Sequence, residues 1–266
     1  MSTPPAGPVA EPFPRLHAPG AQEMLVDAGR CRRPDGALER YTVHQDAEGR
    51  HWVRVAVTPP AEDGWAGAAA TPAASSGEPS PGAAPAGAWA DPVAGVLPAP
   101  SLWHLALAPE GRPERMEARW SEAGTAVELA LTFFPDEVLI WRRGAGPAAE
   151  SLALPPGYRL LWPPVSGREA CLTGLDALLD EQGRGLLMVC ALGCRPVARG
   201  GLRARPVKLG LALAEAPTDD ASTTTSTLRL STPGWPAQHL ELDPDGRLAS
   251  WQVGEDRIAC QRPWNP

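Results

Sequence analysis

The chain has 266 residues and a net charge of −7, which excludes the strongly basic surface that nucleic-acid binding requires. Its 27 glycines and 32 prolines concentrate in stretches that cannot form a packed core. The rest of the chain, about 210 residues, is enough to enclose one hydrophobic core. We therefore expect a single folded domain and no nucleic-acid partner.

The first 14 residues, MSTPPAGPVAEPFP, contain neither a basic leader nor the apolar run of a signal peptide. No apolar run reaches the ~18 residues that a membrane-spanning helix needs. We expect residues 1–14 to be disordered and the protein to be cytoplasmic and not membrane-spanning. Irregular spacing favours reduced thiols over a disulfide framework for the five cysteines, Cys31, Cys171, Cys190, Cys194 and Cys260.

Alternation of apolar and polar residues predicts strands on both sides of a low-complexity stretch. Tyr41 and Val43 precede a turn at 46–49, and Val53 and Val55 follow it, which predicts a hairpin. The stretch at about 59–100 is rich in Ala, Pro and Gly, so we expect a disordered insertion there. The insertion interrupts a single β-rich domain that spans 15–266.

The same alternation continues beyond the insertion. The segment 186–192 is too short and continuous to be assigned by period, but its flanking glycines favour a buried strand. Further strands are predicted at 103–107, 116–120, 127–133, 138–141, 158–162, 207–213, 228–230, 240–242 and 249–253.

One segment changes to helical period. Ser166 and Glu169 match the S-x-x-E capping box that begins many helices. Leucines at 172, 175, 178 and 179 follow at helical spacing before Gly183. This pattern predicts one helix over Ser166–Glu181.

These elements amount to ten to twelve strands around a single helix. Open sheets of more than about ten strands curl or split into two layers. We therefore predict a mainly β fold: a strongly curved antiparallel sheet, as a half-barrel, a partly closed barrel or a sandwich, with one covering helix.

Tryptophan is unusually common, with ten residues against three Phe and two Tyr. A set with about one tryptophan per strand could line a cavity for a lipid, an acyl chain or a sugar ring, or it could pack the core. The candidate ligand-binding residues are Trp52, Trp103, Trp120, Trp141, Trp162 and Trp251.

A basic cluster on this acidic chain is a candidate anion site, formed by Arg203, Arg205 and Lys208. The alternative is the exposed side of an edge strand that ends at Pro206, because charges and proline prevent unwanted strand pairing.

Two short motifs suggest metal binding, each with a simpler explanation. Glu241-x-Asp243-x-Asp245-Gly246 matches the first half of a calcium loop, but the same residues form a turn sequence between two strands. His44 and His51 would face each other across the first hairpin only in one register. We predict no metal, no cofactor and no catalytic residue, because no nucleophile, phosphate or dinucleotide motif is found.

The strand rhythm over 38–260, the helix in its middle and the last hairpin, LELDPDGRLASWQ, resemble the bacterial half-barrel superfamily of lipoprotein-localisation factors and glycolipid-binding proteins. The resemblance implies an open sheet curved around an apolar cavity that holds an acyl chain or a related ligand. The chain lacks a lipobox cysteine, so the resemblance extends only to the fold and the class of ligand.

Three functions follow in order of preference. The first is noncatalytic binding of a hydrophobic or amphipathic small molecule, such as a lipid or glycolipid, in the cavity of the curved sheet. The second is a protein-interaction or scaffold domain with a filled core. The third is an enzyme of unrecognised type, whose catalytic groups would meet from distant strands.

Overall fold

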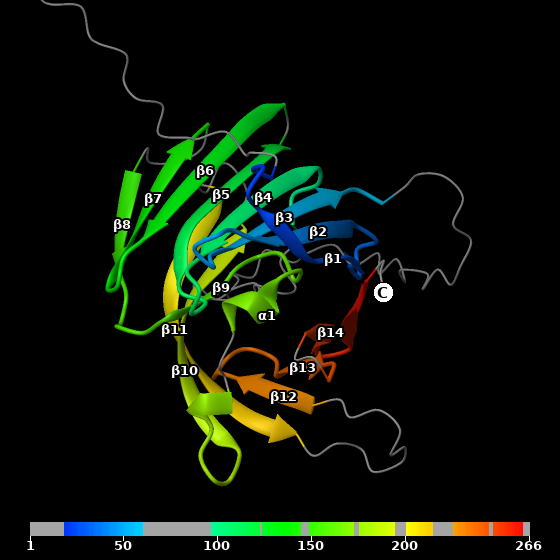
Figure 1. Cartoon of the computed structure of the whole chain (residues 1–266), viewed down its shortest axis with the longest axis vertical. Coiled ribbons are helices and arrows are strands. Elements are labelled where there is room, and N and C mark those ends of the chain that lie inside the picture. Colours follow the sequence, from blue (N-terminus) through cyan, green and yellow to red (C-terminus); the bar gives the residue numbers. More distant parts are fainter. Residues whose placement is uncertain are drawn as a thin grey trace, which may run out of the picture.

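The computed structural model describes residues 19–60, 97–122, 124–144, 149–172, 176–194, 201–214, 226–244 and 247–262. These residues form one sheet of 15 strands, in the order β8-β7-β6-β5-β4-β3-β2-β1-β15-β14-β13-β12-β11-β10-β9. The sheet coils around the short helix α1 and does not close, because β8 and β9 are its two edges (Figure 1). The predicted curved, mainly β fold is confirmed.

Two meanders build this sheet. In each of them, consecutive strands pair antiparallel, except that β9 runs parallel to β10. The first meander contains β1 (Met24–Arg32), β2 (Leu38–Gln45), β3 (His51–Thr58), β4 (Ser101–Leu107), β5 (Pro113–Glu122), β6 (Thr125–Phe133), β7 (Glu137–Arg143) and β8 (Ala149–Ala153). The second contains β9 (Arg159–Leu161), β10 (Arg184–Cys194), β11 (Leu202–Ala214), β12 (Ser226–Ser231), β13 (Gln238–Leu242), β14 (Leu248–Val253) and β15 (Asp256–Gln261).

The two faces of the sheet differ in polarity, as β3 shows. Val53, Val55 and Val57 are almost fully buried on the inner face, whereas Trp52 and Arg54 lie half-buried on the outer face. Side chains alternate between the faces of a strand, so an apolar inner face is what curls the sheet toward its own core.

The predicted strands are confirmed, including the hairpin of β2 and β3 and the buried strand β10. Three strands were not predicted: β1, β8 and β15. Their sequences, MLVDAGRCR, AESLA and DRIACQ, lack a regular apolar face. Residues 1–14 and most of the stretch at 59–100 lie outside the described residues, so the expected disorder there stays a prediction.

The prediction of one helix over Ser166–Glu181 is wrong. The helix α1 spans only Arg168–Cys171, and a 3-10 turn, η1, spans Asp176–Leu178. Ser166 does not cap the helix, because its hydroxyl donates to the carboxylate of Glu39 on β2. The N-cap is instead Gly167, in the left-handed conformation with φ of 72°.

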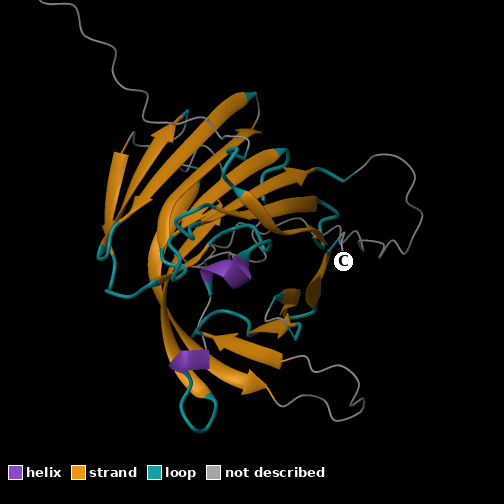
Figure 2. Ribbon diagram, viewed as in Figure 1, coloured by secondary structure: helices purple, strands orange, loops and turns teal. Residues whose placement is uncertain are grey.

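Residues 162–172, which we call the inner segment, lie within the curve of the sheet (Figure 2). Trp162 and Val165 are fully buried there and belong to the core. A Cβ atom on Gly167 would lie 2.5 Å from Cγ1 of Val53 on β3. The inner segment therefore fills the interior and approaches the sheet so closely that only glycine fits at position 167.

Gly167→Ala is expected to destabilise the protein more than Gly157→Ala does. Both glycines have a positive φ, 72° and 74°, but a Cβ on Gly157 meets nothing within 4 Å. Backbone strain costs each variant about 1 kcal/mol or more, and overpacking adds a further ~1–3 kcal/mol to the first alone. Urea unfolding measures both, and equal losses would show that the segment does not touch the sheet at this point.

Candidate functional site

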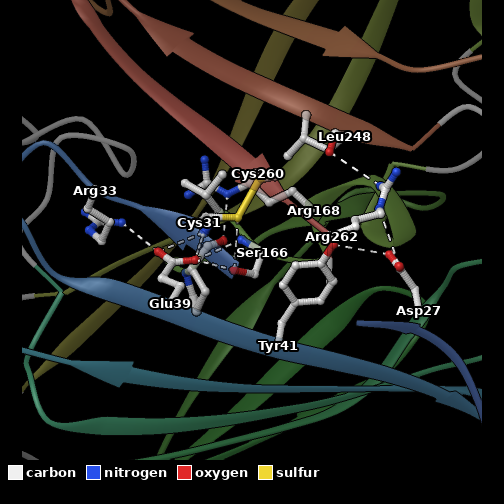
Figure 3. The surroundings of a disulfide bond; sticks show 12 residues. Asp27, Cys31, Arg33, Glu39, Tyr41, Ser166, Arg168, Leu248, Cys260 and Arg262 are labelled. Carbon is white, nitrogen blue, oxygen red and sulfur yellow. Dashed lines mark hydrogen bonds and ion pairs between the residues drawn. A yellow bond between two sulfur atoms is a disulfide. The ribbon is translucent and has the colours of Figure 1, made fainter. Parts of the chain in front are cut away.

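The two meanders join where β1 pairs with β15, which we call the seam. Only three residue pairs form its ladder: Arg30 with Gln261, Cys31 with Cys260, and Arg32 with Ala259. The middle pair is a disulfide with Cα atoms 4.3 Å apart (Figure 3). The prediction of reduced thiols is therefore wrong for Cys31 and Cys260, and it is confirmed for Cys171, Cys190 and Cys194. Irregular spacing in sequence could not show that the first and last strands meet.

Next to the disulfide, the seam opens into a hollow of about 700 Å³. The strands part here because β1 before Arg30 has no ladder partner on β15. At Gly29 the ring of Tyr41, its cross-strand neighbour, packs so close that an added Cβ would lie 2.7 Å from it. The hollow is lined by Ala28, Gly29, Arg30, Arg40, Tyr41, Gln261 and Arg262.

Two arginines of the hollow lie directly opposite each other on neighbouring strands, Arg30 on β1 and Arg40 on β2. Both are exposed. Nε of Arg30 donates to the side chain of Gln261 at 3.1 Å, and among the described residues neither arginine has a carboxylate partner. Like charges directly opposite each other in a sheet are destabilising. The outer wall of the hollow thus carries uncompensated positive charge on an acidic protein.

The third arginine, Arg262, belongs to a cluster of ion-paired residues on the inner side of the hollow. It lies 3.4 Å from Asp27 and also pairs with Asp243. The hydroxyl of Tyr41 donates to Asp27 at 3.3 Å (Figure 3). Burial, and after it the nearby carboxylates Glu169 and Asp27, raise the pKa of Tyr41 above its ordinary value. The phenol therefore stays protonated and keeps its hydrogen bond to Asp27, which leaves its oxygen as an acceptor.

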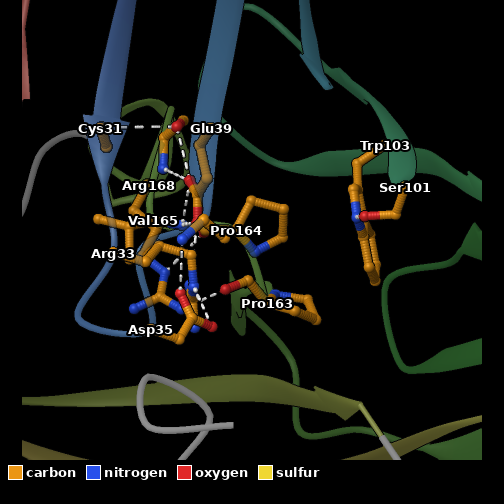
Figure 4. A network of polar contacts seen from close by, with 12 residues as sticks. Cys31, Arg33, Asp35, Glu39, Ser101, Trp103, Pro163, Pro164, Val165 and Arg168 are labelled. Atoms are coloured by element: carbon orange, nitrogen blue, oxygen red, sulfur yellow. Dashed lines mark hydrogen bonds and ion pairs between the residues drawn. The ribbon is translucent and has the colours of Figure 1, made fainter. Parts of the chain in front are cut away.

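Below the disulfide, the carboxylate of Glu39 ties the inner segment to β2 (Figure 4). Glu39 is fully buried and accepts hydrogen bonds from the backbone N–H of Val165 at 3.0 Å and of Ser166 at 2.9 Å. It also accepts the Ser166 hydroxyl at 2.7 Å and pairs with buried Arg33 at 2.9 Å. A buried charge is tolerated only when it is paired and hydrogen-bonded in this way.

On the other side of the seam, Arg168 holds the inner segment against the second meander. Its guanidinium lies over the ring of Trp251 on β14, with 4.4 Å between the guanidinium carbon and the ring centroid. It also donates to the backbone carbonyls of Pro163 at 2.8 Å and Pro164 at 2.9 Å. The inner segment therefore bridges the two meanders behind the hollow.

The next residue, Glu169, has an unusual carboxyl group. Its Oε2 is shielded from solvent and has no hydrogen-bond partner among the described residues. Burial, together with the negative charge of Asp27, raises the pKa of Glu169 to about 7. This carboxyl group titrates near neutral pH behind the hollow.

The structure separates the six predicted tryptophans into two groups. Trp103, Trp120, Trp162 and Trp251 are at most 3% exposed and belong to the core, where the first two stack with ring centroids 5.8 Å apart. Trp141 is 39% exposed on the outer face, and Trp52 is half-buried there beside His104. None of the six lines the hollow.

The predicted anion cluster lies on β11, away from the residues that line the hollow. Arg203 is exposed, and Arg205 lies half-buried over the ring of Trp235, 5.1 Å from its centroid. Lys208 is on the opposite face of the strand, because side chains alternate along the continuous β10–β11 register. The strand continues through Pro206 to Ala214, but its first half pairs only with β10, so it is an edge at that point.

The other sequence candidates are structural. His44 pairs with Trp52 in the β2–β3 register, so it does not face His51. The turn predicted between the last strands is confirmed by the β13–β14 hairpin, although Asp245 and Gly246 lie outside the described residues. Within the described ranges, no three His, Cys, Asp or Glu side chains are placed to hold a metal ion. Burial raises the pKa of Cys190 and Cys194 to about 12, which keeps both thiols protonated at neutral pH.

The fold resembles that of a β-barrel-like protein of a domain of unknown function, DUF1849, from Brucella abortus, with a TM-score of 0.44 and 10% sequence identity. The match covers 89% of this chain and 94% of that chain. No family model and no curated protein matches the sequence. In the part of the chain that the structure describes, no helix is long and apolar enough to cross a membrane.

Glu39→Gln is expected to destabilise the protein by about 3 kcal/mol or more, because it removes a buried charge that accepts four hydrogen bonds and turns an amide NH2 toward the backbone N–H groups of Val165 and Ser166. The matched control is Glu150→Gln. Glu150 also pairs with a buried arginine, Arg142, but is itself 44% exposed, so its loss costs about 1 kcal/mol or less. Chemical denaturation compares the two, and similar losses would contradict the role of Glu39.

Glu169→Gln is expected to stabilise the protein more at pH 8 than at pH 5. The folded state raises the pKa of Glu169 from 4.5 to about 7, so it holds the proton more tightly than the unfolded chain does. This carboxyl group therefore makes stability fall as pH rises from about 4.5 to 7. Glutamine cannot ionise, so the variant does not lose stability in this way as pH rises. Urea midpoints of both proteins at the two pH values measure the effect, and a difference independent of pH would contradict it.

Proposed function

We propose that the protein binds, without catalysis, an amphipathic small molecule whose anionic group contacts Arg30 and Arg40 at the seam hollow. The hollow's volume of about 700 Å³ falls in the range of ~300–1,000 Å³ that is usual for small-molecule sites. Its Gln261 side chain and Tyr41 hydroxyl add polar groups that can orient a ligand.

The observation that carries this proposal is the pair of opposed arginines. A protein with a net charge of −7 places two cations on adjacent positions without a carboxylate for either among the described residues. Their mutual repulsion is relieved when an anion binds between them, since guanidinium groups match carboxylate and phosphate oxygens in geometry.

The walls of the hollow favour a ligand that also has an apolar part. Ala28, Gly29 and the ring of Tyr41 contribute carbon surface at its base. Farther along the same strand, Leu25 lies on the same face of the sheet as Arg30 and is 55% exposed. An alkyl chain that leaves the arginines along β1 would run toward this side chain, which is otherwise in contact with water.

The half-barrel resemblance suggests an alternative position for the ligand, against the tryptophans of the inner face. The inner segment and four buried tryptophans occupy that space, so a ligand there would have to displace part of the core. Ligand contacts by the predicted tryptophans remain a proposal for this second position. Anion binding by Arg203, Arg205 and Lys208 remains a proposal for a separate patch on β11.

The filled interior also supports a second function, a protein-interaction or scaffold domain. Fully buried residues from both meanders form one core cluster. Under this proposal the arginines of the seam would meet an acidic partner protein in place of a small molecule. The predicted cytoplasmic location stays a proposal, and the Cys31–Cys260 disulfide weighs against it, because disulfides persist mainly in oxidising compartments.

Calorimetric titration with octyl phosphate, octyl glucoside and inorganic phosphate tests the proposal. We expect octyl phosphate to bind best, because it alone combines charge with an alkyl chain. Arg40→Gln should weaken its binding by about tenfold or more, the cost of a charge-assisted contact.

Arg229→Gln is the matched control, because Arg229 is an exposed strand arginine of β12 and lies outside the hollow. Lys208→Gln tests the separate basic patch. If octyl phosphate fails to bind, or if Lys208→Gln weakens binding while Arg40→Gln does not, the seam is not the site.

A further inference from the structure

We propose that the Cys31–Cys260 disulfide is a thiol–disulfide exchange site for a dithiol reductant, and that its oxidation state sets the affinity of the seam hollow for its ligand. The second half of this inference rests on the proposed function. The first half concerns the seam itself and stands on the position and exposure of the two cysteines.

The position of the disulfide gives it control over the seam. Between 30–32 and 259–261, the ladder has three pairs, and the cysteines are the middle one. The flanking pair, Arg30 and Gln261, lines the hollow directly. Apart from the chain connection between β8 and β9, this bond is the covalent link between the two meanders.

The unequal burial of the two cysteines determines where exchange begins. Cys31 is 0% exposed, whereas Cys260 retains part of its surface. A thiolate of the reductant attacks the sulfur of Cys260 and forms a mixed disulfide, while the bond to Cys31 breaks and its sulfur leaves with the electron pair and takes up a proton. The second thiol of the reductant then displaces Cys260 as a thiol, so one dithiol is oxidised and one disulfide is reduced.

Reduction changes the space that the seam requires. Bonded sulfurs lie about 2.0 Å apart, whereas atoms that are not bonded pack at about 3.5 Å or more. Cys31 is fully buried, and its sulfur lies 3.5 Å from the Ser166 hydroxyl oxygen, so the reduced sulfur has little room to turn away from Cys260. Two thiols therefore press β1 and β15 apart, and Arg30 and Gln261 separate with them.

A ligand that contacts both β1 and β15 loses a preorganised site when these strands separate. It therefore binds the oxidised protein more tightly than the reduced protein. Coupling of this kind is reciprocal. If reduction weakens octyl phosphate binding about tenfold, saturating octyl phosphate must lower the reduction potential of the disulfide by about 30 mV.

Two measurements on the full chain test the inference. In the first, native protein without ligand is treated with dithiothreitol, and free thiols and backbone hydrogen exchange are followed. We expect two new thiols and faster exchange in 24–32 and 256–262, with unchanged exchange in β5 and β6. A disulfide that resists dithiothreitol until the protein is denatured, or a seam whose exchange does not change, would overturn the inference whatever the ligand does.

The second measurement titrates octyl phosphate into oxidised protein, reduced protein and the double variant Cys31→Ser/Cys260→Ser, with circular dichroism to confirm that each is folded. We expect affinity to fall at least about tenfold in the last two. Equal affinity in all three overturns redox control but leaves the proposed function standing. If octyl phosphate does not bind the oxidised protein, both the proposed function and the redox control of affinity are overturned. The first measurement alone then decides whether the disulfide is an exchange site.

Discussion

The buried carboxylate of Glu39 is the contact on which the interior of this protein depends. It receives two backbone N–H groups, a hydroxyl and a guanidinium, so its charge is fully compensated away from water. The backbone groups belong to the inner segment and the carboxylate to β2, so this cluster fixes the depth and register of the segment. Ser166 also touches the sulfur of Cys31, which places the cluster directly beneath the seam.

A sheet of 15 strands needs such a segment. A sheet with this many strands must curl. When it curls without closing, the side chains of its inner face alone do not fill the interior. Here the chain itself enters the interior after β9, with Gly167 close against Val53 and Arg168 over Trp251. The inner segment thus takes the place that a large ligand would have in a hollow half-barrel. Among the described residues, a hollow remains at the seam, whose ladder has only three pairs.

The sequence predicts the parts of this fold that depend on local alternation. The hairpin of β2 and β3, the buried strand β10 and the last hairpin follow from apolar period and turn residues. The helix was mispredicted because Ser166 and Glu169 match a capping box, while the Ser166 hydroxyl is used by Glu39, 127 residues away in the chain. The candidate site was not predicted at all. Arg30, Arg40 and Arg262 read as scattered surface charges until β1 pairs with β15, and no local pattern encodes that pairing.

The same reasoning explains why charge, disulfide and hollow coincide. Alternation of apolar and polar residues is enough to pair neighbouring strands within each meander. The two meanders pair with each other through β1 and β15, which are remote in sequence. Three ladder pairs are a weak joint, and like charges on Arg30 and Arg40 weaken it further. The disulfide offsets this by restricting the unfolded chain across a separation of 229 residues, a stabilisation of about 2–5 kcal/mol. A joint held covalently can tolerate both an opening beside it and two arginines, Arg30 and Arg40, that have no carboxylate partner among the described residues. Those are the two properties that a site for an anionic ligand requires.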